Sequence, residues 1–304
     1  LRSLELLVCI DIYPSDTIAF ADYALPAATL FEKGGLHFLT STFEPYPFLE
    51  WHSKIVEPRG EARSEWEIFK SISRAARVPF LNDPLLDRFA RILEAVGLDF
   101  SEDLLYRFLL LGKASLGRLK RAPGGIKLGD IRFGELLDHG IRTRDGRLQL
   151  APPDLVDALP EALAEPPAST EEYPLLLVSG VRRLAGYNSW THHIAPLAEK
   201  LSGNWAILNP ADAARLGVTD GQRVQVRSRS RELEIEARLS PDIREGVIGI
   251  HQFFGHKYES GTRASRRFPG VNVNLLHDDT VRDRFCGMPV FNGTPCQVTP
   301  VGEG

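Results

Sequence analysis

The apolar residues after about position 173 repeat with a period of two, and this pattern restricts the fold more than any other feature of the chain. A period of two is typical of strands with one buried face, and short apolar runs are typical of strands buried on both faces. One short helix is predicted at residues 211–216. Several short strands with one small helix favour a mainly β, closed barrel from about residue 173 onward. The predicted strands cover residues 175–178, 206–208, 224–226, 233–239 and 246–250.

Residues 1–80 mix strand and helix patterns and therefore predict α/β structure. Strands are predicted at residues 4–10 and 51–56, and the cluster at residues 15–17 predicts a helix that ends before Pro26. Ser64 and Glu67 form a capping-box pattern at the start of another helix. Further helices are predicted from Pro84 and within residues 101–122.

The composition changes between about residues 123 and 172. Pro123, Gly124 and Gly125 interrupt the helical region, and residues 148–150 predict a short strand. Pro-rich, acidic residues up to 172 are typical of a surface linker. We therefore expect an α/β domain with a helical insertion and linker over residues 1–172, and a barrel domain over residues 173–304.

The overall composition excludes several classes of function. With 304 residues, a net charge of −4 and a pI near 6.1, the chain has no electrostatic reason to bind nucleic acid or an anionic membrane. No apolar run reaches the roughly 20 residues that span a bilayer. Three scattered cysteines are too few for a zinc or iron–sulfur framework.

The first residue is Leu1 and the only methionine is Met288. We expect from this that the chain begins inside a domain, so the pattern does not decide between the cytoplasm and the periplasm.

Common catalytic motifs, such as a phosphate-binding Gly-x-x-x-x-Gly-Lys loop or His-Glu-x-x-His, are missing. His192 and His193 are adjacent, and two adjacent side chains do not converge on a metal without a third ligand. No metal site is predicted.

Longer sequence motifs, unlike the short catalytic motifs, resemble those of a known protein family. Residues 11–28 (DIYPSDTIAFADYALPAA) are similar to a D-x-x-x-T-E-T-A-x-x-A-D-V-V-L-P stretch, followed by residues 30–34 (LFEKG) and 56–68 (VEPRGEARSEWEI). Residues 209–221 (NPADAARLGVTDG) resemble the hallmark of a dinucleotide-binding barrel, and its closing pattern matches residues 272–276, 287–289 and 295–298. Apart from residues 80–145, the chain thus resembles the C-terminal part of molybdopterin oxidoreductases of the dimethyl sulfoxide reductase family.

This resemblance implies a partial α/β nucleotide-binding domain followed by a double-psi-like barrel. It also implies a molybdenum or tungsten bis-molybdopterin guanine dinucleotide. The protein ligand of the metal and a [4Fe–4S] cluster would lie N-terminal to every residue here, so no catalytic residue is assigned and these residues alone are expected to be inactive. An iron–sulfur subunit is the implied electron-transfer partner.

Within that family, residues 250–256 (IHQFFGH) are similar to the P-H-G-F-G-H segment of the thiosulfate and polysulfide reductase branch. The proline before His251 is missing, and Phe254 replaces a glycine. A formate dehydrogenase, a hydratase, and a separate cofactor-binding subunit without catalysis are the alternatives.

A pterin guanine dinucleotide is long, polar and doubly phosphorylated. It requires loops with free N–H groups, Gly for close approach, and Asn, Asp and Ser to bind the ring edges. Ser179 and Gly180 follow a predicted buried strand, Arg182 suits a phosphate, and Asp11 ends a strand where α/β sheets bind ligands. The candidate cofactor-binding residues are Asp11, Ser15, Thr17, Ser179, Gly180, Arg182, Asn209, Asp212, His251, Asn274 and Gln297.

Several of these residues have a second interpretation. Asp212 is expected either to accept from guanine or to cap the following helix, and Ser15 and Thr17 either cap a helix or contact a nucleotide. His251 is expected either to lie near the pterin or substrate funnel or to be a structural histidine whose hydrogen bonds are satisfied within the protein. Asn274 and Gln297 carry amides that both donate and accept, which suits a pterin edge.

Overall fold

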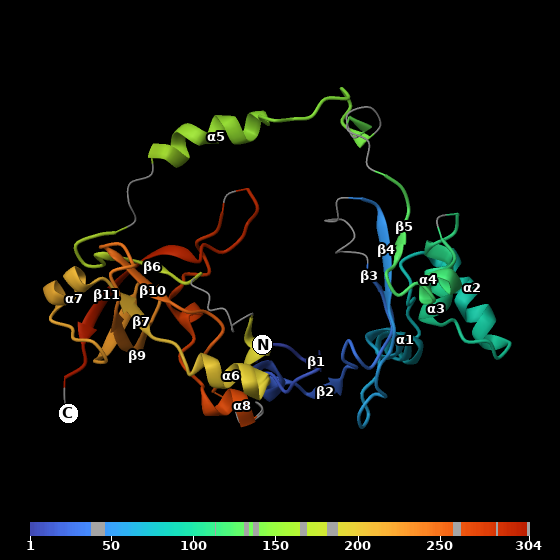
Figure 1. Ribbon diagram of the computed structural model, residues 1–304, viewed down its shortest axis with the longest axis horizontal. Helices are drawn as coiled ribbons and strands as arrows, with labels where there is room; N and C mark the ends of the chain where they lie inside the picture. Colours follow the sequence, from blue (N-terminus) through green and yellow to red (C-terminus); the bar gives the residue numbers. More distant parts are fainter. Residues whose placement is uncertain are drawn as a thin grey trace. The chain divides into compact units, whose positions relative to one another are not determined.

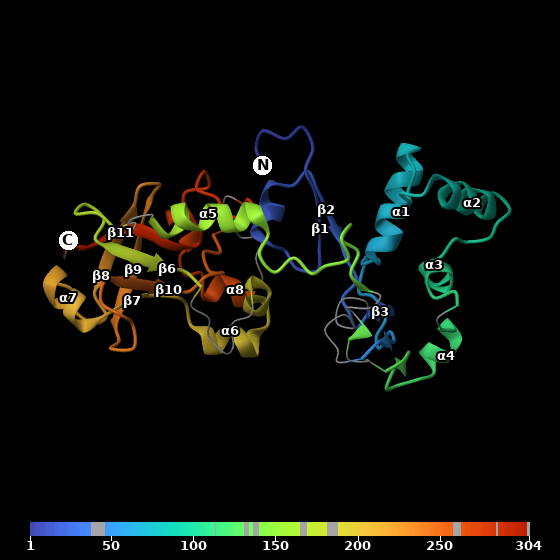
Figure 2. The same cartoon turned by 90° about the horizontal axis from the view of Figure 1, so that it is seen from above.

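The computed structural model forms two compact units (Figures 1 and 2). One unit comprises Leu1–Leu7, Tyr13–Asp22 and Pro160–Gly304, and the other comprises Val8–Ile12 and Tyr23–Leu159. The structure describes residues 1–37, 46–112, 114–130, 134–135, 140–164, 169–180, 188–257, 263–283 and 285–302. Within these ranges no helix has the length and apolar character needed to cross a membrane.

The first unit is built on a closed, six-stranded barrel, as the period of two predicts (Figure 1). The strand order is β10-β6-β11-β8-β9-β7, and the pairs β10–β6 and β7–β9 are parallel while the others are antiparallel. Every strand therefore has two neighbours, and the barrel has no open edge. The strands are β6 (Leu175–Val178), β7 (Ala206–Leu208), β8 (Arg223–Ser228), β9 (Glu232–Leu239), β10 (Val247–Ile250) and β11 (Asn292–Pro300).

Alternate side chains of these strands fill the barrel. Val224 and Val226 of β8 are fully buried, and their neighbours on β9, Ile235 and Leu233, are buried opposite them. The intervening residues of β9 are exposed glutamates and an arginine. Helix α7 (Pro210–Leu216) begins with proline in its first turn and ends at Gly217, whose φ of 67° suits glycine.

The first unit also contains several short helices. They are the 3-10 helices η1 (Asp16–Phe20), η4 (Ser189–His193) and η5 (Val273–Leu276), and the α-helices α6 (Ala195–Leu201) and α8 (Arg263–Arg267). Helix α5 (Pro153–Ala164) comes before β6 in the chain and crosses the division between the units at Pro160.

The second unit is α/β. Strands β1 (Val8–Asp11) and β2 (Tyr23–Pro26) form a parallel pair. An antiparallel sheet contains β3 (Gly35–His37), β4 (Phe48–His52) and β5 (Ile126–Lys127). The helices are α1 (Glu65–Ala76), α2 (Pro84–Ala95), α3 (Glu102–Leu109) and α4 (Leu116–Lys120). Leu36, Leu49 and Ile126 of the sheet pack on Leu116 and Leu119 of α4.

Several boundaries differ from the predictions, because a strand needs a partner and not only an apolar run. The first strand begins at Val8, since only Val8–Asp11 pairs with β2, and Leu4 and Leu6 are exposed. The predicted helix before Pro26 is shorter, a 3-10 helix over Asp16–Phe20, and β2 follows it. The second predicted strand lies earlier, at Phe48–His52, in register with β3.

Two further predictions in the connecting region were wrong. Residues 148–150 form no strand, and Leu150 is exposed. The first part of the predicted linker is helix α5, because Pro153 suits a first turn and Leu155, Leu159 and Leu163 repeat at helical spacing.

The helix starts were predicted well, because they depend on local hydrogen bonds. The Ser64 hydroxyl accepts a hydrogen bond from the Glu67 amide at 3.3 Å, as the capping box predicts. Helix α2 begins at Pro84, and the Asp83 carboxylate accepts from the Leu85 and Leu86 amides at 2.9 Å each.

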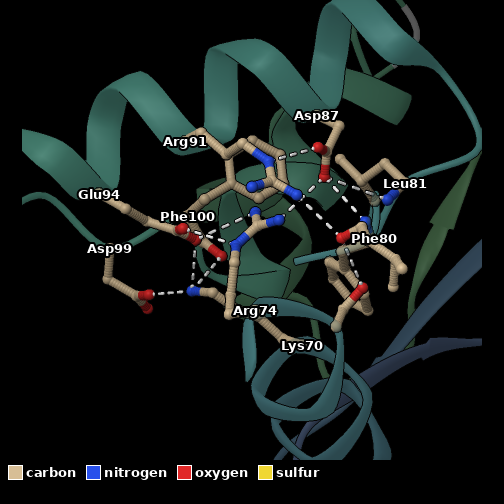
Figure 3. A network of polar contacts seen from close by, with 11 residues as sticks. Lys70, Arg74, Phe80, Leu81, Asp87, Arg91, Glu94, Asp99 and Phe100 are labelled. Carbon is tan, nitrogen blue, oxygen red and sulfur yellow. Dashed lines mark hydrogen bonds and ion pairs between the residues drawn. The ribbon is translucent and has the colours of Figure 1, made fainter. Parts of the chain in front are cut away.

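An ion-pair network joins α1 to α2 (Figure 3). The Asp87 carboxylate, which is buried, accepts from Arg74 Nη1 at 3.1 Å and from Arg91 Nε at 2.8 Å. Glu94 lies about two turns after Asp87 on the same side of α2. It pairs with Arg74 Nε at 2.8 Å and with Lys70 at 3.2 Å. Lys70 also pairs with the exposed Asp99. Each buried charge therefore has more than one partner, as burial of charge requires.

Burial alone raises the pKa of the Asp87 carboxyl. Hydrogen bonds from Arg91, from the Phe80 amide at 2.9 Å and from Arg74 outweigh this effect and hold the pKa well below its ordinary value. The carboxylate thus stabilises the folded unit above the ordinary aspartate pKa of about 3.9, and this stabilisation is lost as the pH falls through and below that value.

We expect Asp87→Asn to lower the free energy of unfolding of the second unit by about 3 kcal/mol at pH 7, because Arg74 and Arg91 lose a buried counter-charge. Urea unfolding followed by helical circular dichroism measures this change. The matched control is Asp99→Asn, whose ion pair is exposed and should contribute less than about 1 kcal/mol. Equal effects of the two substitutions would contradict the assignment.

Candidate functional site

The ends of three barrel strands meet at Ser179, directly after β6. The Ser179 side chain is fully buried, and its hydroxyl donates to the Phe291 carbonyl at 2.7 Å. Gln252 Nε2, after β10, lies 2.9 Å from the same hydroxyl oxygen, and His277 Nε2 lies 3.1 Å from it. His277 Nδ1 in turn lies 2.8 Å from the Thr294 hydroxyl of β11. We call these side chains, with Asn292, the serine–histidine node.

The single hydroxyl proton of Ser179 fixes the remaining hydrogen bonds. Because this proton points at a carbonyl, Gln252 and His277 must both donate to the serine oxygen. His277 is then protonated on Nε2, and Nδ1 accepts from Thr294. Burial lowers the pKa of His277, which agrees with a neutral ring. Ser179 is therefore not an activated nucleophile, since the neighbouring histidine nitrogen carries a proton.

Asn292 holds the chain where it leaves β6. Its side-chain oxygen accepts from the amides of Ser179 at 3.2 Å and Gly180 at 3.3 Å. The node therefore sets the position of Gly180 at the end of the strand. Arg182, which was predicted to meet a phosphate, lies outside the described residues.

A second polar cluster includes His256, which lies after β10 in the same segment as Gln252. His192 Nδ1 and His256 Nε2 are 2.7 Å apart, and His192 is only 3% exposed. The Phe254 ring lies 4.3 Å from the His192 ring, centroid to centroid. Tyr13 stacks on His193 at 4.8 Å. We call His192 and His256 the histidine pair.

The backbone around the histidine pair is tightly constrained. Gly255 has φ of 102°, and a Cβ atom there would lie 2.4 Å from the Cβ of Asn272. Glycine is needed at this position for both reasons. Phe253 has φ of 75°, an unusual conformation for a bulky residue. Strained backbone of this kind is concentrated at functional sites.

Both members of the histidine pair are neutral at pH 7. Burial lowers the pKa of His192 to about 4, and the neighbouring His256 and His193 add to the shift. Burial also lowers the pKa of His256, while Asp16 opposes the change. In a neutral pair one ring donates its proton and the other accepts it.

Asp16 lies beside this pair and was missed as a site residue. Its Oδ2 is 3.4 Å from the Lys257 amide, and its Oδ1 is buried without a donor among the residues that the structure describes. The sequence placed Asp16 only in a helix-start cluster, and no local pattern indicates that residues 254–257 pack against it. The unsatisfied oxygen is the signal, and it is visible only in the structure.

The candidates from the first part of the chain are divided between the two units. Asp11 ends β1 in the second unit, whereas Ser15 and Thr17 belong to the first. Ser15 occupies the N-cap position of η1, yet its side chain makes no capping hydrogen bond. Thr17 is exposed.

Asn209 and Asp212 are occupied by contacts inside the barrel unit. Asn209 caps α7, accepting from the Ala211 amide at 2.9 Å and donating to the Ile243 carbonyl at 2.8 Å. Asp212 is fully buried; one oxygen accepts from the Gly246 amide at 2.7 Å and the other pairs with Arg215. Asp212 therefore connects α7 to the start of β10, and Asn209, not Asp212, is the cap.

The last three candidates are dispersed. His251 is buried, with its ring 6.1 Å from that of Trp205. Asn274 is exposed on η5. Gln297 sits further along β11 than the node, where Arg227 Nη2 donates to its side-chain oxygen at 3.1 Å. Within the described part of the chain no group of three or more His, Cys, Asp or Glu side chains is arranged to hold a metal ion.

The first unit is a closed barrel with buried polar clusters at the ends of its strands. Residues 175–295 match the family described as "Molydopterin dinucleotide binding domain", and residues 1–75 match "Molybdopterin oxidoreductase". The chain belongs to the molybdopterin oxidoreductases of the dimethyl sulfoxide reductase family.

Individual relatives agree with this membership. The chain is 28% identical, over 95% of its length, to an F420-dependent formate dehydrogenase subunit alpha of Methanocaldococcus jannaschii. It is 26% identical, over 90% of its length, to the thiosulfate reductase molybdopterin-containing subunit PhsA of Salmonella typhimurium. These matches span 38% and 37% of the two relatives, so the chain covers well under half of their length.

A solved structure agrees on the fold. Acetylene hydratase from Pelobacter acetylenicus matches 97% of this chain and 40% of its own, with a TM-score of 0.65 and 21% sequence identity. At this identity the match concerns the fold alone.

We expect the free energy of unfolding of the barrel unit to fall as the pH is lowered from about 7 to 4. Unfolded His192, with an ordinary pKa of about 6.5, binds a proton that the folded ring does not bind, so stability rises with pH through this window. Urea unfolding at a series of pH values measures the slope. His192→Asn should flatten the slope, and an unchanged slope in that variant would contradict the role of His192.

Proposed function

We propose that these residues form the cofactor-clamping, C-terminal portion of the catalytic subunit of a molybdenum or tungsten bis-molybdopterin guanine dinucleotide oxidoreductase. The observation that carries the proposal is the barrel's match to a dinucleotide-binding family, together with the polar clusters at the ends of its strands. The domain division at residue 172, the double-psi topology and an iron–sulfur electron-transfer partner belong to the same proposal.

The residues present fit such a group. The buried Asp16 oxygen without a donor suits the N–H edge of a pterin or guanine ring, which would satisfy it. Exposed Asn274 offers an amide that both donates and accepts. Gly180, held by Asn292, would bring backbone close to a phosphate, and Arg182 follows it. We assign Asp212 a supporting role in this set, because both of its oxygens already accept hydrogen bonds.

When bound, the cofactor supplies the redox chemistry, and the protein supplies position and electrostatics. The serine–histidine node orients the chain after β6, and the protons of the Ser179 hydroxyl, His277 Nε2 and the Thr294 hydroxyl are all donated within it. The histidine pair holds one proton between His192 Nδ1 and His256 Nε2 and adds no net charge at pH 7. Phe254 shields this pair on one side.

For the substrate, we propose thiosulfate or polysulfide reduction. Support comes from residues 250–256 and from the similarity to the thiosulfate reductase subunit. Formate oxidation and hydration are the alternatives, supported by comparable similarity to formate dehydrogenase subunits and by 24% identity to acetylene hydratase of Syntrophotalea acetylenica. Assays of the complete enzyme with thiosulfate, formate and acetylene distinguish the three.

Cofactor retention tests the clamping role. The purified complete enzyme should release GMP on acid hydrolysis and yield a fluorescent oxidised pterin. Asp16→Ala and Asn274→Ala should each reduce both signals by about tenfold, corresponding to the loss of roughly 1.4 kcal/mol of binding.

The matched control is Asp279→Ala, an exposed carboxylate near the node that should retain the cofactor fully. Circular dichroism checks that each variant is folded. Full retention in both site variants would refute their role, and a protein that carries neither GMP nor pterin would refute the proposed function.

A further inference from the structure

Helix α2 is amphipathic, and its apolar side faces away from the unit to which it belongs. At 100° per residue, Asp87, Ala90 and Glu94 lie on one side of the helix and Leu85, Phe89 and Ile92 on the other. The first side contacts α1 through Arg74 and is buried at Asp87 and Ala90. The apolar residues, with Val96 at the C-cap, are exposed: Leu85 79%, Phe89 41%, Ile92 54% and Val96 67%.

The ion-pair network explains this orientation (Figure 3). Turning α2 to bury its apolar side would separate Asp87 and Glu94 from Arg74 and leave buried charges unpaired. The helix is thus fixed with its charged side inward. The four exposed apolar residues, Leu85, Phe89, Ile92 and Val96, are called here the α2 seam. In both overall views α2 lies away from the sheet formed by β3, β4 and β5 (Figures 1 and 2).

The spacing of the α2 seam indicates what covers it. Its members are separated by four, three and four residues, the a/d spacing of a helix that packs on another helix. The spacing is also symmetric about the midpoint between Ala90 and Arg91. In an antiparallel pair of α2 helices, Leu85 therefore faces Val96 of the second copy, and Phe89 faces Ile92.

The residues beside the seam are compatible with this pairing. On α2, Arg88 is the only charged residue beside the seam, and in the antiparallel register it lies opposite Ala95 of the second copy, so the two α2 helices bring no like charges together. Leu86 and Leu93 border the other side. The Phe108 ring of α3 contacts Phe89, with 6.0 Å between centroids, and extends the apolar surface.

We propose that the α2 seam is a self-association surface, on which α2 of one copy packs antiparallel against α2 of a second copy. This inference concerns the second unit and does not depend on the proposed cofactor. Phe89 in the seam and Arg88 at its border are residue types that are enriched in such interfaces.

Sedimentation velocity of the purified chain over a range of concentrations tests the proposal. A reversible dimer is expected, and Ile92→Glu should weaken it by more than about a hundredfold, because each dimer then buries two carboxylates. The matched control is Leu150→Glu, since Leu150 is 85% exposed and lies outside α2. Circular dichroism and thermal unfolding verify that both variants are folded.

Cross-linking tests the register. In a Cys286→Ser background, which removes the exposed cysteine, Arg88→Cys combined with Ala95→Cys should form an intermolecular disulfide. Arg88→Cys alone should not, because two copies of residue 88 lie about five residues apart along the antiparallel pair, on the order of 7 Å. A chain that stays monomeric, a dimer that tolerates Ile92→Glu, or efficient cross-linking through Arg88→Cys alone would each overturn the proposal.

Discussion

Closure of the barrel determines where the polar groups of the first unit lie. Because every barrel strand has two neighbours, backbone hydrogen bonds are satisfied around the ring and alternate side chains fill the interior. The chain can leave this ring only at the strand ends, and Ser179, Gln252 and Asn292 lie at three of these ends. The hydrogen bonds among them follow from closure, although β6 and β11 are more than a hundred residues apart in the sequence.

The sequence predicted the parts of the fold that depend on short-range physics. Alternation located β8 and β9, short apolar runs located β6, β7 and β10, and the Ser64 capping box and Pro84 marked the starts of α1 and α2. It did not predict β11 as a strand or β2 as the partner of β1, because pairing is a long-range property. The linker was misjudged for a different reason: proline is rare inside helices, yet Pro160 lies inside α5.

The site was predicted less well than the fold. Ser179 and Gly180 do lie at a strand end, but Asp212 and Asn209 are held by contacts within the barrel unit. Asp16, His256 and His277 were not proposed, because their contacts join segments that only the folded chain brings together. The amphipathic pattern of α2 likewise predicted a helix but not which side faces inward, which the charges of Arg74 and Lys70 on α1 decide.

The hydrogen bonds of the serine–histidine node have a direction. Thr294 donates to His277, His277 donates to Ser179, and Ser179 donates to the Phe291 carbonyl, which has no proton to return. A carbonyl at the end prevents the series from reversing, so this node cannot conduct protons. The histidine pair has no such end, since either ring can carry the shared proton. The hydrogen bonds of the node therefore have one fixed direction, whereas in the histidine pair either ring can be the donor.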